Sequence, residues 1–174
     1  MAREATPERM TRTFPEQLQA VHADHHASLY RYLDRLSGDP DLAADIVQEA
    51  FVRLYRRGSL PERPDRWLVT VALNLFRNER SMTRRRKALR LEREGDLSPA
   101  RPLSPAERVD EQERRRAIRA ALDLLPRRDR ELLLLRAEGY SYRDLAAVLE
   151  LHEASVGTLL ARAKRAFRAT WEGE

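Results

Sequence analysis

The stretch from Leu125 to Phe167 is the part of this 174-residue chain that most restricts its fold. It reads LPRRDRELLLLRAEGYSYRDLAAVLELHEASVGTLLARAKRAF, with apolar residues at three- and four-residue intervals, the spacing of amphipathic helices. Gly139 ends one predicted helix, and Ser141 caps the next, with Asp144 three residues further on. Another helix follows over about 153–170. The last two helices, separated by a few polar residues, have the layout of a helix-turn-helix, which places its second helix in a DNA major groove.

The second helix of this pair is expected to have an apolar inner face and a polar outer face. On the outer face, Arg162 can fork onto a guanine, and Thr158 can meet a base edge or a thymine methyl group. Basic side chains nearby suit phosphate contacts, which position a protein on DNA without specifying sequence. The alternative is an ordinary helical hairpin whose basic face is only solvated. The candidate DNA-binding residues of this segment are Arg143, Ser155, Thr158, Arg162, Lys164 and Arg165.

The rest of the chain also has helical periodicity, with no strand pattern and no internal repeat. Apolar spacing predicts three helices that can enclose one small core, over about 16–36, 40–57 and 65–86. A proline-bearing stretch without a helical face follows. We therefore predict an all-α protein of two small helical domains joined by a flexible linker, the second carrying the helix-turn-helix. The predicted segments are a disordered tail 1–14, a first domain 15–91, a linker 92–104 and a second domain 105–174.

The third predicted helix carries residues suited to unpaired DNA. Asn74 and Asn78 lie four residues apart on one helical face, and asparagine can hydrogen-bond a base edge. A basic run follows, which can neutralise phosphates. Trp67 and Phe76 can stack on an unpaired base, although a core position for Trp67 and solvated asparagines are the alternative. The candidate residues are Trp67, Asn74, Asn78, Arg84, Arg85 and Arg86.

Two further groups of polar residues precede that helix. Asp45, Gln48 and Glu49 give the helix over 40–57 an acidic polar face, which is either solvated or a docking surface for a protein partner. A histidine cluster with helical spacing lies earlier, at His22, His25 and His26. Two such histidines can hold a metal, but no third ligand has an evident spacing, so a surface cluster is the favoured reading.

Composition excludes several classes of protein. The chain has no cysteine, which rules out disulfides, thiolate zinc sites and cysteine nucleophiles. It also lacks a glycine-rich phosphate loop and a nucleophile with a credible base, so we expect no catalytic, metal or cofactor site. No apolar run approaches the roughly 18 residues of a membrane span, and the first residues, MAREATPERMTRTF, lack the apolar region of a signal peptide. A cytoplasmic protein without membrane insertion is expected, and the net charge of +5 favours an anionic partner.

Three blocks of the sequence together resemble the sigma-70 family, specifically the extracytoplasmic-function (ECF) sigma factors. LYRYLDRLSGDPDLAADIVQEAFVRLYRR is similar to the family's first-domain core and its polymerase-docking helix. RWLVTVALNLFRNERSMTRRRK is similar to its promoter-melting helix, and the segment 125–167 is similar to its C-terminal helix-turn-helix. The resemblance covers about residues 16–170.

The resemblance implies a promoter-specificity subunit that directs bacterial core RNA polymerase to promoters and helps melt the −10 element. It is not an enzyme itself. The acidic face formed by Asp45, Gln48 and Glu49 matches family positions that contact the clamp helices of the largest polymerase subunit. An anti-sigma factor is a further expected partner, and a monomer is expected when the protein is free.

The resemblance also implies roles for the DNA-facing residues. Asn74 and Asn78 match positions that meet the flipped −10 base and its neighbours, and the loop 58–65 matches the loop that receives that base. Thr158 and Arg162 match positions that read the −35 element.

Departures from the family pattern fall in the helix-turn-helix. Glu150 stands where the turn usually has glycine, which adopts positive φ at little cost. Gly157 stands where a basic residue is usual, and Leu159 where arginine is frequent, so recognition of the −35 element is expected to differ. The alternative to a sigma factor is a stand-alone helix-turn-helix regulator with an N-terminal dimerisation or sensing bundle. Such a regulator would be a dimer on a palindromic site.

Overall fold

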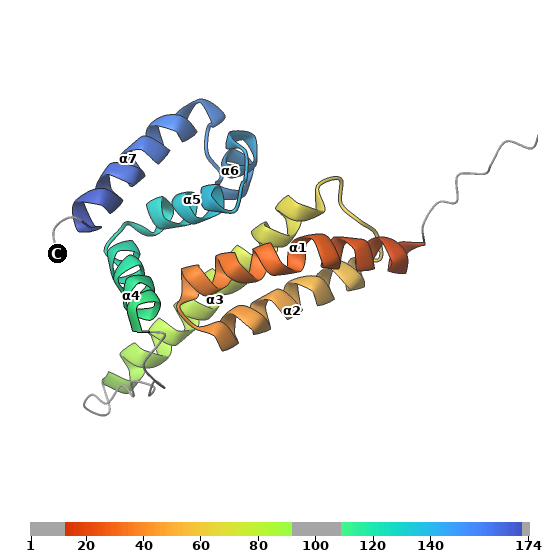
Figure 1. Cartoon of the computed structure of the whole chain (residues 1–174). Coiled ribbons are helices and arrows are strands. Elements are labelled where there is room, and N and C mark those ends of the chain that lie inside the picture. The colour runs from red at the N-terminus through yellow and green to blue at the C-terminus, as the bar shows by residue number, and fades with distance from the viewer. Residues whose placement is uncertain (1–12, 92–108, 172–174) are drawn as a thin grey trace, which may run out of the picture.

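The computed structural model of the chain describes residues 13–91 and 109–171, apart from the side chains of 84, 86–91, 109–112 and 115. Every element in these ranges is a helix, so the predicted all-α fold is confirmed. Figure 1 shows their arrangement. The helices are α1 (Phe14–Ser37), α2 (Pro40–Arg57), α3 (Pro64–Leu91), α4 (Val109–Asp123), α5 (Arg127–Ala137), α6 (Tyr142–Leu149) and α7 (Glu153–Trp171). The predicted linker, 92–104, lies outside the described residues.

Local hydrogen bonds set the ends of the first two helices. Gly38 follows α1 at φ 76°, and its N–H donates to the carbonyl oxygen of Asp34, a geometry that glycine adopts without steric cost. Asp39 then caps α2, because its carboxylate accepts two backbone N–H groups of the first turn. At the start of α1, the N–H of Thr13 donates to the carboxylate of Glu16. The helix therefore begins at Phe14, inside the segment predicted to be a tail.

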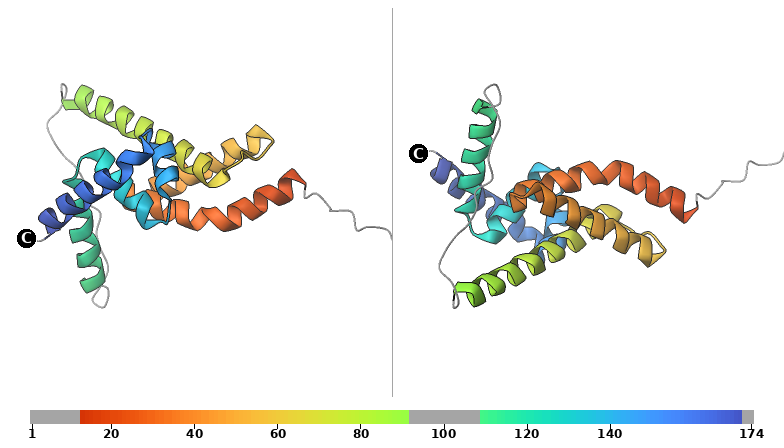
Figure 2. Two further views of the ribbon diagram at one scale, coloured as in Figure 1. Left: turned by 90° about the horizontal axis from the view of Figure 1, so that it is seen from above. Right: turned by 90° about the horizontal axis from the view of Figure 1, so that it is seen from below.

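The first three helices form a bundle around an apolar core (Figures 1 and 2). Helical spacing groups Leu68, Val71, Ala72 and Leu75 on one face of α3. Leu68 and Ala72 are buried, but Val71 and Leu75 are only half-buried. The buried face of α3 instead includes Val69, Leu73 and Phe76. Apolar residues fill nearly every position from 68 to 76, so spacing alone does not choose between neighbouring faces.

The remaining helices form a second cluster in which α7 packs against α4, α5 and α6. Both views in Figure 2 and the view in Figure 1 place α7 on the side of this cluster that is away from α2. The side chains at the centre of the cluster come from three helices, and they include Leu132, Leu135, Leu145, Val156 and Leu160.

The two helical clusters contact each other directly. Helix α5 packs against α1, and α6 packs against α3. Two arginines of α1, Arg31 and Arg35, form ion pairs with Glu138 just after α5, at 3.1 and 2.8 Å. The arginine of α3 at position 77 reaches Glu131 of α5, with 2.7 Å between Nη2 and Oε2. The contact between the clusters is therefore polar and charged as well as apolar.

Within the two described ranges, no helix combines the length and the apolar character that a membrane span requires.

Candidate nucleic-acid interface

The predicted helix-turn-helix is formed by α6, a short turn and α7. Ser141 and Asp144 make a reciprocal capping box at the start of α6: the Ser141 hydroxyl accepts the N–H of Asp144, and the Asp144 carboxylate accepts the N–H of Ser141. In the turn, Glu150 adopts φ 54° and ψ 54°, and the N–H of Leu151 donates to the carbonyl of Ala146 at 2.8 Å. The expected strain at Glu150 is therefore present, because a residue with a Cβ occupies the left-handed region.

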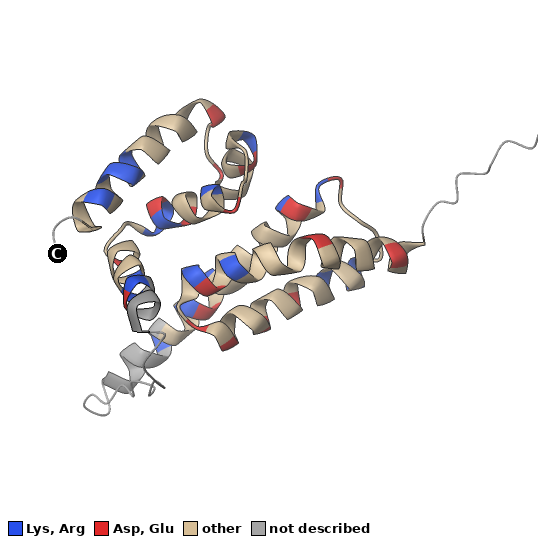
Figure 3. Cartoon of the chain, viewed as in Figure 1, with Lys and Arg blue, Asp and Glu red and all other residues tan. Residues whose placement is uncertain are grey.

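The faces of α7 follow the sequence prediction closely. Val156, Leu160 and Ala163 are buried, whereas Phe167 is half-buried. Leu159 is half-buried as well, so it does not lie fully on the outer face. Figure 3 shows Lys and Arg along α7, with an acidic residue at its start. All six candidate residues of the helix-turn-helix are exposed: Arg143, Ser155, Thr158, Arg162, Lys164 and Arg165.

Arg162 has a partner that the sequence did not reveal. Its Nη2 donates to the Asp129 carboxylate at 2.6 Å. Asp129 comes from the first turn of α5 and is buried, whereas the side chain of Arg162 is 55 % exposed. The guanidinium is therefore held at one nitrogen and open to solvent elsewhere.

Helix α3 presents a second exposed polar face. Asn74 and Asn78 are both exposed, Arg85 is exposed further along, and Trp67 is half-buried two turns before Asn74. Asn74 and Asn78 follow Trp67 by seven and eleven residues, so all three lie on one side of the helix. The helix continues through Arg84 and Arg86, whose side chains lie outside the described residues.

Phe76 was predicted as a stacking surface for a base, and this prediction is wrong. The side chain is 1 % exposed and belongs to the core of the three-helix bundle. Its ring faces inward because Phe76 continues the buried series through Val69 and Leu73, at intervals of four and three residues. Of the two predicted aromatic surfaces, Trp67 alone retains exposed area.

The segment 58–65, which comprises the loop before α3 and the first two residues of that helix, contacts the helix-turn-helix. Arg63 pairs with Asp65 at 2.8 Å and also lies 3.2 Å from the Asp144 carboxylate. Arg66, in the first turn of α3, approaches the same oxygen of Asp144 at 3.5 Å. The hydrogen bond and the charge of Arg63 lower the pKa of Asp65, against the opposing effect of desolvation. One carboxylate at the start of α6 thus joins the helix-turn-helix to this loop.

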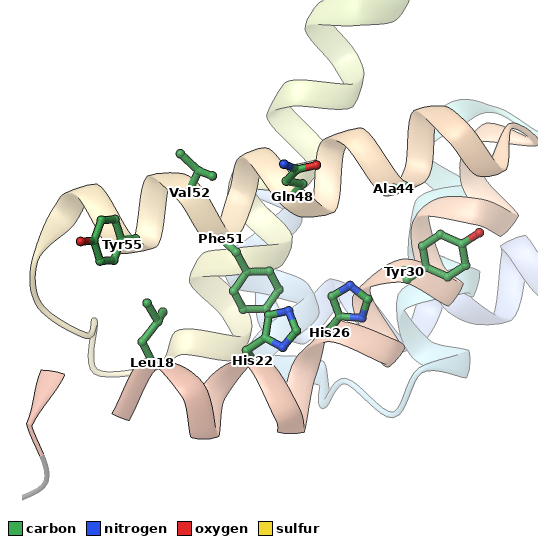
Figure 4. Close-up of a pocket in the computed structure, with 9 residues that line it drawn as sticks. All are labelled: Leu18, His22, His26, Tyr30, Ala44, Gln48, Phe51, Val52 and Tyr55. Carbon is green, nitrogen blue, oxygen red and sulfur yellow. The ribbon is translucent and has the colours of Figure 1, made fainter. Parts of the chain in front are cut away.

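The acidic face of α2 borders an apolar groove. Asp45 and Gln48 are exposed, and Glu49 is half-buried with its carboxylate 2.8 Å from Nε of Arg53. Gln48 also lines the groove between α1 and α2, which Figure 4 shows. Most of the residues that line the groove are apolar or aromatic: Leu18, Tyr30, Ala44, Phe51, Val52 and Tyr55.

Two of the three histidines line the same groove. The ring of His22 lies 4.8 Å from that of Phe51 and 4.7 Å from that of His26, measured between centroids. Figure 4 shows His22 and His26 beside Phe51. In the part of the chain that the structure describes, no three histidine or carboxylate side chains come together as a metal site.

Comparisons with known proteins match the two helical clusters separately. The family model "Sigma-70 region 2" matches residues 21–87, and "Sigma-70, region 4" matches residues 115–167. The ECF RNA polymerase sigma factor EcfG of Rhodopseudomonas palustris is 37 % identical, over 80 % of this chain and 75 % of that protein. The ECF sigma factor SigL of Mycobacterium tuberculosis is 32 % identical, over 88 % of each chain. This chain belongs to the ECF sigma factors of the sigma-70 family.

Other similar proteins agree with this assignment. The ECF sigma factor SigE of Mycolicibacterium smegmatis is 31 % identical over 88 % of this chain, which spans 60 % of the length of that relative. A solved structure of the sigma factor RpoE from Bartonella quintana, in complex with the anti-sigma factor NepR, has a TM-score of 0.64. It covers 91 % of this chain and 96 % of its own at 24 % identity, which supports the two-domain helical fold.

The two matches place the candidate surfaces of this ECF sigma factor in different regions. The region 2 match includes the acidic face of α2 and the asparagine face of α3. The region 4 match includes Arg143 and the outer face of α7. The stand-alone regulator is therefore not favoured, because such a protein does not require a region 2 domain. Sequence reasoning missed the ion pairs that join the regions, because the partners lie far apart in the chain.

Proposed function

We propose that this ECF sigma factor is the promoter-specificity subunit of a bacterial RNA polymerase, with its three tasks assigned to three helices. The observation that carries the proposal is the separation of three exposed polar surfaces. They are the acidic face of α2, the asparagine face of α3 and the outer face of α7. A single DNA-binding module has no use for the first two surfaces.

The acidic face of α2 docks on the core enzyme in this proposal. Asp45, Gln48 and Glu49 meet the clamp helices of the largest subunit, and the neighbouring groove between α1 and α2 supplies apolar area. An interface with an apolar centre and a charged rim is typical of specific protein contacts.

The asparagine face of α3 opens the −10 element. Asn74 and Asn78 hydrogen-bond bases of the separated strand, and the half-buried Trp67 offers its ring for stacking. Arg84, Arg85 and Arg86 neutralise nearby phosphates. The loop 58–65 receives the flipped base.

The outer face of α7 reads the −35 element. Thr158 and Arg162 contact base edges, while Arg143, Ser155, Lys164 and Arg165 contact the phosphate backbone. The sigma factor performs no catalysis of its own, needs no cofactor and works in the cytoplasm as a monomer when free. Because RpoE of Bartonella quintana was solved with the anti-sigma factor NepR, we also propose an anti-sigma partner for this chain.

Run-off transcription with core polymerase on a genomic fragment library tests the proposal directly. The full chain should convert core enzyme, which initiates without promoter specificity, into a form that starts at defined sites without ATP hydrolysis. If the protein neither binds core polymerase in a pull-down nor yields specific transcripts, the proposal is wrong.

The docking surface can be tested separately by charge reversal. The double variant Asp45→Lys, Glu49→Lys should weaken binding to core polymerase by about tenfold or more, because like charges across an interface cost several kcal/mol. A matched control, Asp24→Lys with Glu113→Lys, makes the same change in net charge at exposed positions on α1 and α4. Unchanged affinity of the first variant, or equal loss in both, would remove the docking assignment.

A further inference from the structure

Helix α5 carries two buried carboxylates, and each is bonded to an arginine of a different helix. Asp129 is 3 % exposed and accepts a hydrogen bond from Arg162 of α7, while Glu131 is 1 % exposed and accepts one from Arg77 of α3. Burying a carboxylate is costly unless a cation compensates it. Each arginine is therefore bonded to a carboxylate that is buried in the interior of the protein.

The Asp129–Arg162 pair differs from an ordinary surface ion pair in its asymmetry. The carboxylate is fixed by burial in α5, which packs beside α7 (Figure 1). More than half of the arginine side chain remains exposed. A guanidinium has five N–H donors in a planar fork, and this bond uses one of them at a distance of 2.6 Å.

An arginine without such a partner is free to contact the DNA backbone instead of a base. Its flexible side chain reaches phosphates as readily as base edges, and phosphate contacts carry no sequence information. A carboxylate bonded to the guanidinium acts against this in two ways. It restricts the rotamers of the arginine, and its negative charge disfavours a nearby phosphate.

We propose that Asp129 is a positioning residue for promoter recognition. It holds the guanidinium of Arg162 in the orientation that reads a base of the −35 element and keeps it from the phosphate backbone. This inference rests on the proposed role of Arg162 as a −35 reader. Asp129 itself contacts no DNA.

A purely structural role for Asp129 makes different predictions. An acidic residue in the first turn of a helix stabilises that helix through its dipole, and Asp129 has this place in α5. In that case its removal would lower the melting temperature without changing which base is preferred. The experiment must therefore measure base preference and salt dependence as well as stability.

The test uses the full chain assembled with core polymerase. The templates derive from a promoter that the parent holoenzyme selects from a genomic library, with its −35 region randomised, and sequencing of the transcripts gives the preference at each position. The variants are Asp129→Ala, Asp129→Asn, Arg162→Ala and the double alanine variant. Asp123→Ala is the matched control, because it makes the same charge change in the same domain while its partner is Arg130 of α5.

Asp129→Ala should lower the preference for the favoured base about three- to thirtyfold, at the same −35 position that Arg162→Ala affects. Adding Asp129→Ala to Arg162→Ala should cause no further loss at that position. Asp129→Asn, which keeps an acceptor oxygen, should restore part of the preference. Promoter binding by the Asp129→Ala holoenzyme should also depend more steeply on salt, with a slope larger by up to about 0.9, because the freed arginine can neutralise one more phosphate.

The inference is overturned if Asp129→Ala leaves the preference unchanged while Arg162→Ala abolishes it. It is also overturned if Asp129→Ala lowers transcription equally on all templates, or if Asp123→Ala relaxes the same position. If Arg162→Ala changes no position, the −35 role of Arg162 is itself wrong, and the inference fails with it. Should Asp129→Ala not fold, as judged by circular dichroism, the same comparisons apply to Asp129→Asn, whose side chain has nearly the same shape.

Discussion

Tyr140 lies at the junction of the two helical clusters, where its surroundings oppose ionisation. Burial raises the pKa of Tyr140 to about 12, and the carboxylates of Asp65, Asp144 and Glu138 act in the same direction. In an unfolded chain the phenol releases its proton near pH 10. The protonated tyrosine therefore contributes stability that is complete below pH 10 and is lost as the pH rises to 12.

We predict that Tyr140→Phe reduces the fall in the free energy of unfolding at alkaline pH. The free energy of unfolding of the parent protein should fall between pH 10 and 12, and the variant should fall less over this window. Urea unfolding at a series of pH values measures both, with Tyr55→Phe as a control because Tyr55 is 63 % exposed. Identical pH profiles for Tyr140→Phe and the parent would contradict the assigned role.

Glu150 allows a second prediction at this scale. Its left-handed conformation costs a residue with a Cβ roughly 1–2 kcal/mol relative to glycine. We expect Glu150→Gly to raise the free energy of unfolding by about 1 kcal/mol and Glu150→Asn by less, while Glu150→Ala gives no gain. Denaturant unfolding distinguishes these variants, and a loss of stability in Glu150→Gly would contradict the strain argument.

The residues that sequence predicted best are those whose roles depend on near neighbours. The Ser141 cap and the Gly139 helix end involve partners three positions away, so a local pattern is sufficient. Asp129 and Glu131 differ, because their arginines are 33 and 54 positions distant. Pairing at such distances depends on how the helices pack, and a single sequence contains no signal for it.

At the scale of elements, different faces of α3 contact the core, the neighbouring domain and solvent. Phe76 points into the bundle, Arg77 reaches α5, and Asn78 is exposed. Neighbouring residues on a helix are about 100° apart, so three consecutive positions meet three environments. Sequence reasoning found the exposed face through its asparagines, but it took Phe76, a core residue, for a base-stacking surface.

We predict that Asn74→Ala impairs strand opening without affecting −35 recognition, because its proposed partner is a base that becomes available only after melting. Permanganate footprinting of holoenzyme on linear promoter DNA should show reduced reactivity in the −10 region, and a pre-melted template should restore much of the activity. Thr83→Ala, an exposed change on the opposite side of α3, is the control. If Asn74→Ala opens promoters as well as the parent does, Asn74 is only a solvated helix residue.

At the scale of the whole molecule, charged side chains join the two domains at several points. Glu131 and Glu138 both form ion pairs with arginines of the N-terminal bundle. The carboxylate of Asp144 lies near two further arginines, Arg63 and Arg66. Because the arginines are partly exposed while these carboxylates are nearly buried, neutralising the carboxylates should weaken the contact without leaving a buried cation.

We predict that Glu131→Gln with Glu138→Gln shifts the free protein toward separated domains, by about 1–3 kcal/mol in total. The chain has no cysteine, so cysteines introduced at the exposed positions Ala27 of α1 and Ala161 of α7 give unique sites for a dye pair. Energy transfer between the dyes should fall in the double variant. Glu49→Gln with Asp123→Asn, which affects ion pairs inside single domains, should leave it unchanged; equal transfer in all three proteins would contradict the prediction.

The short helix α6 contacts both α3 and α7, and this limits how far apart the two helices proposed to bind DNA can be. With eight residues, α6 is about 12 Å long. Promoter elements near −10 and −35 are separated by roughly 25 base pairs, which is about 85 Å along the duplex. In the proposed function, therefore, a molecule reaches both elements after its domains have separated. If the contacted form outnumbers the separated form tenfold, the proposed affinity for a promoter falls about elevenfold, so the strength of the contact between the domains would set the fraction of protein that is competent to bind.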